Sequence, residues 1–128
     1  EIDDNDDYYV PSKSLIELYK SSDACVFPSL IETFAMINIE AMASSIPVIS
    51  TNAPGCKESI IDNYDGLLSE PGNAKDLAEK IDQIYSSIDL RKKLIANGKN
   101  TISSKYDWKI IGKKFENLYY TEISNKGE

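Results

Sequence analysis

The chain has 128 residues, of which 41% are hydrophobic and 27% are charged, the composition of one ordinary globular domain. Its net charge of −7 excludes a nucleic-acid-binding surface built from clustered Lys and Arg. The sequence has no histidine, the commonest zinc ligand, and no apolar run of the ~18 residues that a membrane-spanning helix needs.

Two isolated cysteines, Cys25 and Cys56, fit thiols in a reducing compartment better than a disulfide framework, so we expect a cytoplasmic protein. The chain opens without Met on an Asp-rich stretch, residues 1–9, which we expect to be frayed. We interpret residues 1–128 as a single domain from which an upstream part is missing.

The first half of the chain predicts helices alternating with short strands. Ser12 is placed to cap a short amphipathic helix. The apolar run 24–27 is typical of a buried parallel strand, and a second strand is expected over 47–50. Between these strands a helix is predicted over about 34–44.

The second half continues the alternation. A brief helix is expected over 57–61, and the turn at Asp65-Gly66 leads into a third strand at Leu67-Leu68. Asn73 and Asp107 are placed to cap two further helices, with another helix over about 90–103 between them. Three aromatic side chains near the end are expected to pack in the core, with stacking on a nucleotide base as the alternative: Trp108, Tyr119 and Tyr120. The pattern predicts an α/β domain with a Rossmann-like parallel sheet flanked by helices.

Glu40 is the most conspicuous residue of the 34–44 helix. This helix is apolar almost all round, so we expect it to be buried. No Lys or Arg occurs between Lys20 and Lys57, so the nearby sequence offers Glu40 no cation. A buried carboxylate needs hydrogen-bond donors, which the hydroxyls of a bound ligand would supply. A distant Lys, a backbone amide or solvent are the alternatives.

Glu32 precedes the same helix, in the loop that leaves the first strand. Ligands of open α/β sheets bind at such carboxyl ends of strands. The helix N-terminus carries partial positive charge, so the amides of Phe34, Ala35 and Met36 are candidates for contact with a pyrophosphate. The alternative is that Glu32 only caps the helix.

An ordered series of motifs surrounds these two glutamates, which are separated by seven residues. The series resembles the retaining GT-B glycosyltransferases, most closely family 4 (glycosyl transferases group 1), over roughly residues 12–119. Besides the glutamate pair, the similar segments are Phe27-Pro28-Ser29, residues 40–49, the loop 52–58, residues 65–68 and Pro71-Gly72-Asn73.

The resemblance implies a C-terminal donor-binding part of a GT-B fold. It implies that Glu32 contacts the donor sugar as the catalytic residue, that the amides of Phe34, Ala35 and Met36 lie near the diphosphate, and that Glu40 binds the ribose hydroxyls. Glu58 would prop its own loop. The implied reaction transfers a hexosyl group from a nucleotide-diphosphate sugar with retention, without metal or other cofactor. The partner would be an N-terminal acceptor domain, absent here, so the isolated chain is expected to be inactive.

The chain departs from the family at three positions. The family usually has Gly where this chain has Ala35, Ser45 and Pro54. Ala35 adds a methyl group where the backbone would approach phosphate, and Pro54 leaves Gly55 as the flexible residue of its loop. The Arg and Lys that clamp the diphosphate in the family have no match here.

Other functions stay open beside this one. A noncatalytic nucleotide-sugar-binding module would share the same pocket. A phosphoacceptor regulator would use the acidic cluster at residues 3–7, although no apolar strand precedes it, and a calcium loop there would lack its central Gly and closing Glu. Peripheral membrane association through the absent half also stays open.

Overall fold

The computed structural model describes residues 11–125, so the predicted frayed start at residues 1–9 lies outside the described residues. Three parallel strands form one sheet in the order β1-β2-β3, with Val26 beside Ile49 and Ile49 beside Leu67. The strands are β1 (Cys25–Val26), β2 (Val48–Thr51) and β3 (Leu67–Ser69); the helices are α1 (Lys13–Ser21), α2 (Met36–Ala43), α3 (Ala74–Ser86), α4 (Ile88–Thr101) and α5 (Trp108–Asn125), with a 3₁₀ turn η1 (Lys57–Ser59) and a π turn η2 (Ile102–Tyr106).

Local capping fixes the helix ends close to where the sequence places them. Ser12 accepts a hydrogen bond from the Leu15 amide at 3.2 Å, and Asn73 accepts one from the Asp76 amide at 3.1 Å. Helix α4 begins earlier than predicted because Ser87 caps it, and it passes into η2 at its end. The predicted Rossmann-like α/β architecture is confirmed.

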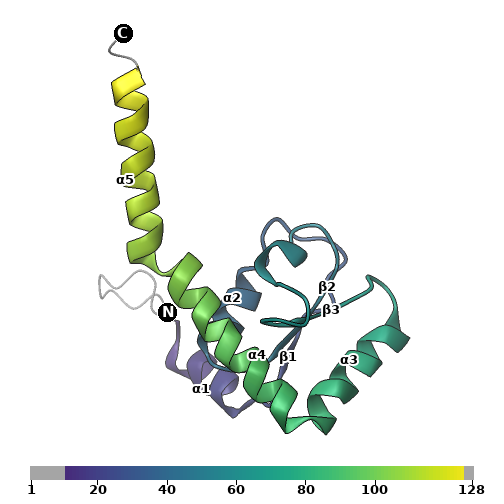
Figure 1. Ribbon diagram of the computed structural model, residues 1–128. Coiled ribbons are helices and arrows are strands. Elements are labelled where there is room, and N and C mark those ends of the chain that lie inside the picture. Colours follow the sequence, from purple (N-terminus) through teal and green to yellow (C-terminus); the bar gives the residue numbers. More distant parts are fainter. Residues whose placement is uncertain (1–10, 126–128) are drawn as a thin grey trace.

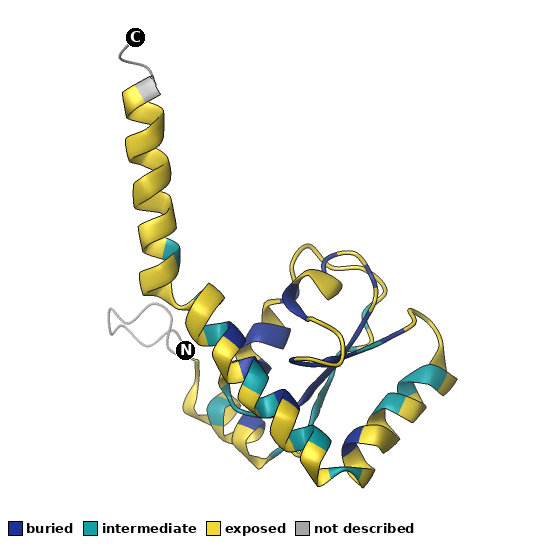
Figure 2. Ribbon diagram, viewed as in Figure 1, coloured by how far each residue is buried: buried dark blue, intermediate teal, exposed yellow. Residues whose placement is uncertain are grey.

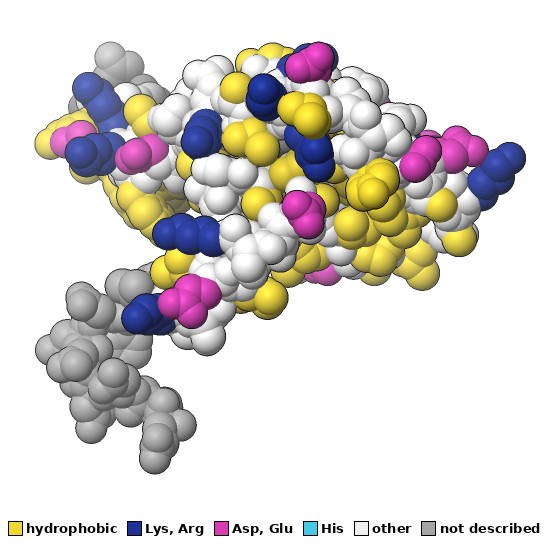
Figure 3. Space-filling view, turned by 90° about the horizontal axis from the view of Figure 1, so that it is seen from below, with side chains coloured by type: hydrophobic (Ala, Val, Ile, Leu, Met, Phe, Trp, Pro, Cys, Tyr) yellow, Lys and Arg dark blue, Asp and Glu magenta, His cyan; other side chains and the backbone are white. Residues whose placement is uncertain are grey.

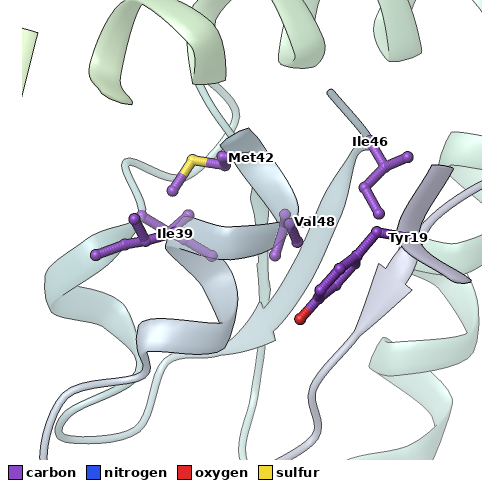
Figure 4. Close-up of a cluster of buried hydrophobic side chains, with 7 residues drawn as sticks. Tyr19, Ile39, Met42, Ile46 and Val48 are labelled. Atoms are coloured by element: carbon purple, nitrogen blue, oxygen red, sulfur yellow. The ribbon is translucent and has the colours of Figure 1, made fainter. Parts of the chain in front are cut away.

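The core has two layers, one on each face of the sheet (Figure 1). Val48 and Ile49 are successive strand residues, so their side chains point to opposite faces. The Val48 layer joins α1 and α2 to the sheet through Tyr19, Ile39, Met42 and Ile46 (Figure 4). The Ile49 layer joins α3 and α4 through Leu67, Ile84 and Leu94. Because β2 is buried along its whole length, it is the rigid centre of the domain.

Helix α5 projects away from this body (Figure 1). Figure 2 shows it exposed along almost its whole length, and Trp108 is 81% exposed. The prediction that Trp108, Tyr119 and Tyr120 pack in the core is wrong, because the helix that carries them points away from the sheet.

The charged side chains of the described residues are of both signs. On the lower face, Lys and Arg side chains are interspersed with acidic and hydrophobic ones (Figure 3). Among residues 11–125, no helix combines the length and the apolar character that crossing a membrane requires.

Candidate functional site

The predicted site lies where the three parallel strands end. The chain leaves β1 through Pro28 and Ser29 and enters α2 at Met36, so Glu32 stands in the strand-to-helix connection, as predicted. The loop after β2, residues 52–56, lies against this connection through backbone hydrogen bonds. Because the carboxyl ends of parallel strands share one edge, these two loops form the edge at which open α/β sheets bind ligands.

The Glu32 carboxylate is exposed and does not cap the helix. The cap position of α2 is Ala35, and no side chain makes a capping hydrogen bond there. Instead the Ser29 hydroxyl donates to Glu32 Oε1 at 3.2 Å. The alternative that Glu32 caps the helix is therefore excluded. Its carboxylate faces solvent, and the hydrogen bond from Ser29 holds it in position.

Backbone contacts between the two loops fix the position of Glu32. Its own amide donates to the Pro54 carbonyl at 3.0 Å, and the Ala35 amide donates to the Gly55 carbonyl at 2.8 Å. Gly55 has a φ of +78°, and a Cβ built on it would lie 1.8 Å from the Glu32 carbonyl oxygen. Only glycine permits this close approach. Any side chain at position 55 would push the two loops apart.

The three candidate amides at the start of α2 differ in whether they already donate a hydrogen bond within the protein. The Ala35 amide is bonded to Gly55, and the Met36 amide donates to the Phe34 carbonyl at 2.7 Å. Within residues 11–125 the Phe34 amide has no acceptor. Ala35 is buried, so its methyl group does not lie on the exposed surface where a phosphate would bind. Phe34 thus has the one free amide of the three.

The prediction that Glu40 is buried is wrong. Only one side of α2 packs onto the sheet, through Asn38, Ile39, Ala41 and Met42, and Glu40 lies on the exposed side. Its carboxylate oxygen Oε2 accepts a hydrogen bond from the Tyr19 hydroxyl at 3.1 Å. Burial of Tyr19 and this bond to Glu40 raise the pKa of Tyr19 to about 12. The sequence did not identify Tyr19 as a partner, because it comes from α1, far from Glu40 in the chain.

The site is an exposed face among residues 11–125 rather than an enclosed pocket. Phe34 and Met36 are exposed beside the two glutamates, and Phe34 packs on Tyr106 of η2 with ring centroids 6.3 Å apart. A hollow of about 180 Å³ lies nearby, at the ends of β2 and β3 and the start of α3. None of the predicted site residues lines it.

The two cysteines and Glu58 complete the set of candidate residues. Cys56 is buried and Cys25 half-buried, as expected for core or loop residues, and burial raises the pKa of the Cys25 thiol. Glu58 is exposed in η1. Within residues 11–125, acidic and cysteine side chains form no cluster of three that could hold a metal ion.

Comparison with known proteins identifies the family. The model of the family "Glycosyl transferases group 1" matches residues 8–101. The capsular polysaccharide biosynthesis glycosyltransferase CapM of Staphylococcus aureus is 33% identical over 83% of this chain, which spans 28% of CapM. The chain is thus similar to less than a third of that relative.

Solved structures support the same assignment. The C-terminal domain of a group 1 family protein (LpcC) from Francisella tularensis is 34% identical, with a TM-score of 0.69, over 78% of this chain and 52% of that one. The Anabaena protein HepE, solved with UDP-glucose, has the same fold at 23% identity, with a TM-score of 0.75 over 82% of this chain and 29% of HepE. The GT-B glycosyltransferase fold is confirmed, and the chain belongs to the glycosyl transferases group 1.

Proposed function

We propose that this chain binds the nucleotide-sugar donor of a retaining hexosyltransferase. The observation that carries the proposal is the pair of exposed carboxylates, with Glu32 in the connection between β1 and α2 and Glu40 in α2. Glu32 neither caps the helix nor has a role in the core, and Ser29 holds its carboxylate at the solvent-exposed face, where it can contact a ligand.

Glu40 binds the ribose hydroxyls in this proposal. Tyr19 donates to Oε2, while Oε1 has no hydrogen-bond partner within residues 11–125. A carboxylate with one oxygen anchored and one free can accept hydrogen bonds from a diol while keeping its orientation. Tyr19 therefore orients Glu40 without neutralising it.

The phosphates lie between the two glutamates, over the start of α2. The Phe34 amide supplies a donor, and the helix dipole adds partial positive charge. Fixed donors of this kind stabilise the charge that develops on the leaving phosphate during transfer. Glu32 contacts the sugar and is the catalytic residue, and no metal takes part.

The rest of the enzyme supplies the acceptor site. The chain spans 28% of CapM, and the site residues lie on an uncovered face; in this proposal a second domain closes the pocket. The exposed aromatic side of α5 offers a surface for that domain. The isolated chain binds the donor but does not transfer the sugar, and the complete enzyme works in the cytoplasm.

Ligand titration of the chain tests the binding role. UDP, GDP and ADP are added separately while amide chemical shifts are followed by NMR; UDP comes first because HepE, which shares the fold, was solved with UDP-glucose. We expect one nucleotide to shift residues 32–40 and to leave α3 unchanged. Shifts at the hollow beside α3 instead, or none at millimolar nucleotide, would refute the proposal.

Two variants of the complete enzyme divide the roles. Glu32→Gln should lower kcat strongly with little change in donor KM, whereas Glu40→Gln should mainly raise KM, by roughly 10–100-fold. Identical behaviour of the two variants would contradict the division. A noncatalytic binding module that uses the same two carboxylates is the second candidate; nucleotide binding without any transfer by the complete protein would select it.

A further inference from the structure

A buried asparagine sits inside the otherwise apolar packing side of α2. Asn38 is fully buried, and its Nδ2 lies 3.0 Å from Ser59 Oγ, 3.2 Å from Ser50 Oγ and 3.2 Å from the Cys56 carbonyl. Its Oδ1 is buried and has no hydrogen-bond partner within residues 11–125. The side chain thus connects α2 to both β2 and the segment around η1, at the expense of one unsatisfied oxygen.

Fold stability alone does not explain this asparagine. A buried carbonyl oxygen without a donor destabilises the folded state, and an apolar side chain of similar size would remove it. The two serine hydroxyls keep other acceptors in such a variant. Ser59 Oγ also donates to the Cys56 carbonyl at 3.2 Å, and Ser50 Oγ to the Phe27 carbonyl at 3.5 Å.

The contacts of Asn38 extend the hydrogen bonds between the two site loops. Glu32 is bonded to Pro54, Ala35 to Gly55, and Asn38 to Cys56. These three bonds join the β1–α2 connection and the first turn of α2 to successive residues of one loop, with Glu32 at the solvent end and Asn38 at the buried end. Loss of the buried end would free residues 54–56 to move away from Glu32.

We propose that Asn38 is a positioning residue for donor binding. It holds the loop after β2 against the start of α2, so that the Glu32 carboxylate and the Phe34 amide keep their places. This inference rests on the proposed donor-binding function, and it adds a residue that touches no substrate. The side-chain amide of Asn38 lowers the stability of the folded state but holds the site residues in position.

The test compares Asn38→Leu with Asn97→Leu in the 128-residue chain. Asn97 is the control, because it also lies on a helix and donates to a loop carbonyl, that of Tyr64 at 2.8 Å, but it belongs to α4 and is half-buried. Three quantities are measured: the urea midpoint of unfolding, hydrogen exchange of the Glu32 and Ala35 amides, and the Kd for whichever of UDP, GDP and ADP the native chain binds most tightly.

For Asn38→Leu we expect an unfolding midpoint equal to or above the native one. Exchange at Glu32 and Ala35 should be faster, and Kd should rise on the order of tenfold. Asn97→Leu should lower the midpoint and leave the other two quantities unchanged. Ser59→Ala, which removes the acceptor at 3.0 Å, should speed exchange at Glu32 and Ala35 and raise Kd as Asn38→Leu does, but more weakly.

Several results would overturn the proposal. An Asn38→Leu chain that does not fold, or that loses stability while exchange at Glu32 and Ala35 stays native, gives Asn38 a purely structural role. Native Kd and native exchange together would do the same. If the native chain binds none of the nucleotides, the proposed function fails, while the exchange measurement still decides whether Asn38 holds the two loops together.

Discussion

The site segment and helix α5 are held in place by different kinds of contact. In the site, Glu32 is bonded to Pro54 and Ala35 to Gly55, partners about twenty residues away. In α5, side-chain hydrogen bonds are local: Thr121 donates to the Asn117 carbonyl at 2.9 Å and Ser124 to that of Tyr120 at 2.9 Å. One region exists because distant segments meet, and the other because its own sequence forms a helix.

The difference predicts how each region responds to substitution. A change that separates two packed segments loses every contact between them, whereas a change on an isolated helix alters only that helix. The following substitutions contrast tertiary contacts with local ones, from the largest expected effect to the smallest.

Gly55→Ala should lower the free energy of unfolding by at least about 3 kcal/mol, because the new Cβ would strike the Glu32 carbonyl and position 55 has a positive φ. Urea unfolding of the purified chain measures the loss. Gly112→Ala in α5 is the control: its Cβ meets nothing within 4 Å, so it should stabilise the chain by about 0.5–1 kcal/mol or leave it unchanged. Equal losses in both variants would contradict the comparison.

Asp65→Ala should cost about 2–4 kcal/mol. Asp65 is buried and accepts from the Thr101 hydroxyl at 2.7 Å and from the Ile61 amide at 2.7 Å, so its removal leaves two donors without partners and loosens α4 from its loop. The local counterpart is Asp107→Ala, which removes the cap on the Lys109 amide and should cost about 1 kcal/mol. Thermal unfolding ranks the two; a larger loss for Asp107→Ala would reverse the comparison.

Tyr19→Phe tests the contact between α1 and Glu40 through its pH dependence. The folded chain raises the pKa of Tyr19 from 10.0 to about 12, so the folded state holds this proton more tightly than the unfolded state does. The resulting stabilisation is present below pH 10 and is lost as the pH rises to 12, with an upper bound of about 2–3 kcal/mol. The stability gap between native chain and variant should therefore narrow over this interval.

Unfolding free energies of both chains at pH 8, 10 and 11 measure that gap. Other groups titrate in both chains alike, so the difference isolates Tyr19. A gap that is constant with pH would show that burial and Glu40 do not raise the pKa of the Tyr19 hydroxyl.

Phe115→Gln on α5 should change the free energy of unfolding by less than about 0.5 kcal/mol, because its side chain is exposed and the helix has few tertiary contacts. Met42→Ala, on the buried side of α2, should cost about 2–4 kcal/mol in the same measurement. A loss above about 1 kcal/mol for Phe115→Gln would mean that α5 packs on the body of the isolated chain in solution.

The sequence alone determined the order of the elements and much of their ends. Ser12 and Asn73 cap the helices predicted for them, because a capping bond joins residues three positions apart and needs nothing from the rest of the fold. The short apolar runs became three parallel strands for a similar reason, since β-branched and apolar residues suit a buried sheet. Glu32 therefore lies at the edge of the sheet, as the sequence pattern predicted.

Only the tertiary structure decided which side chains are covered. An apolar helix pattern predicted burial of Glu40 and of the aromatic residues of α5, but a side chain is buried only if a partner lies over it, and the partner comes from elsewhere in the chain. For the same reason, the sequence alone did not predict the contacts of Tyr19 and Asn38 or the close approach of Gly55 to Glu32. Each of these depends on a contact between segments about twenty residues apart in the sequence.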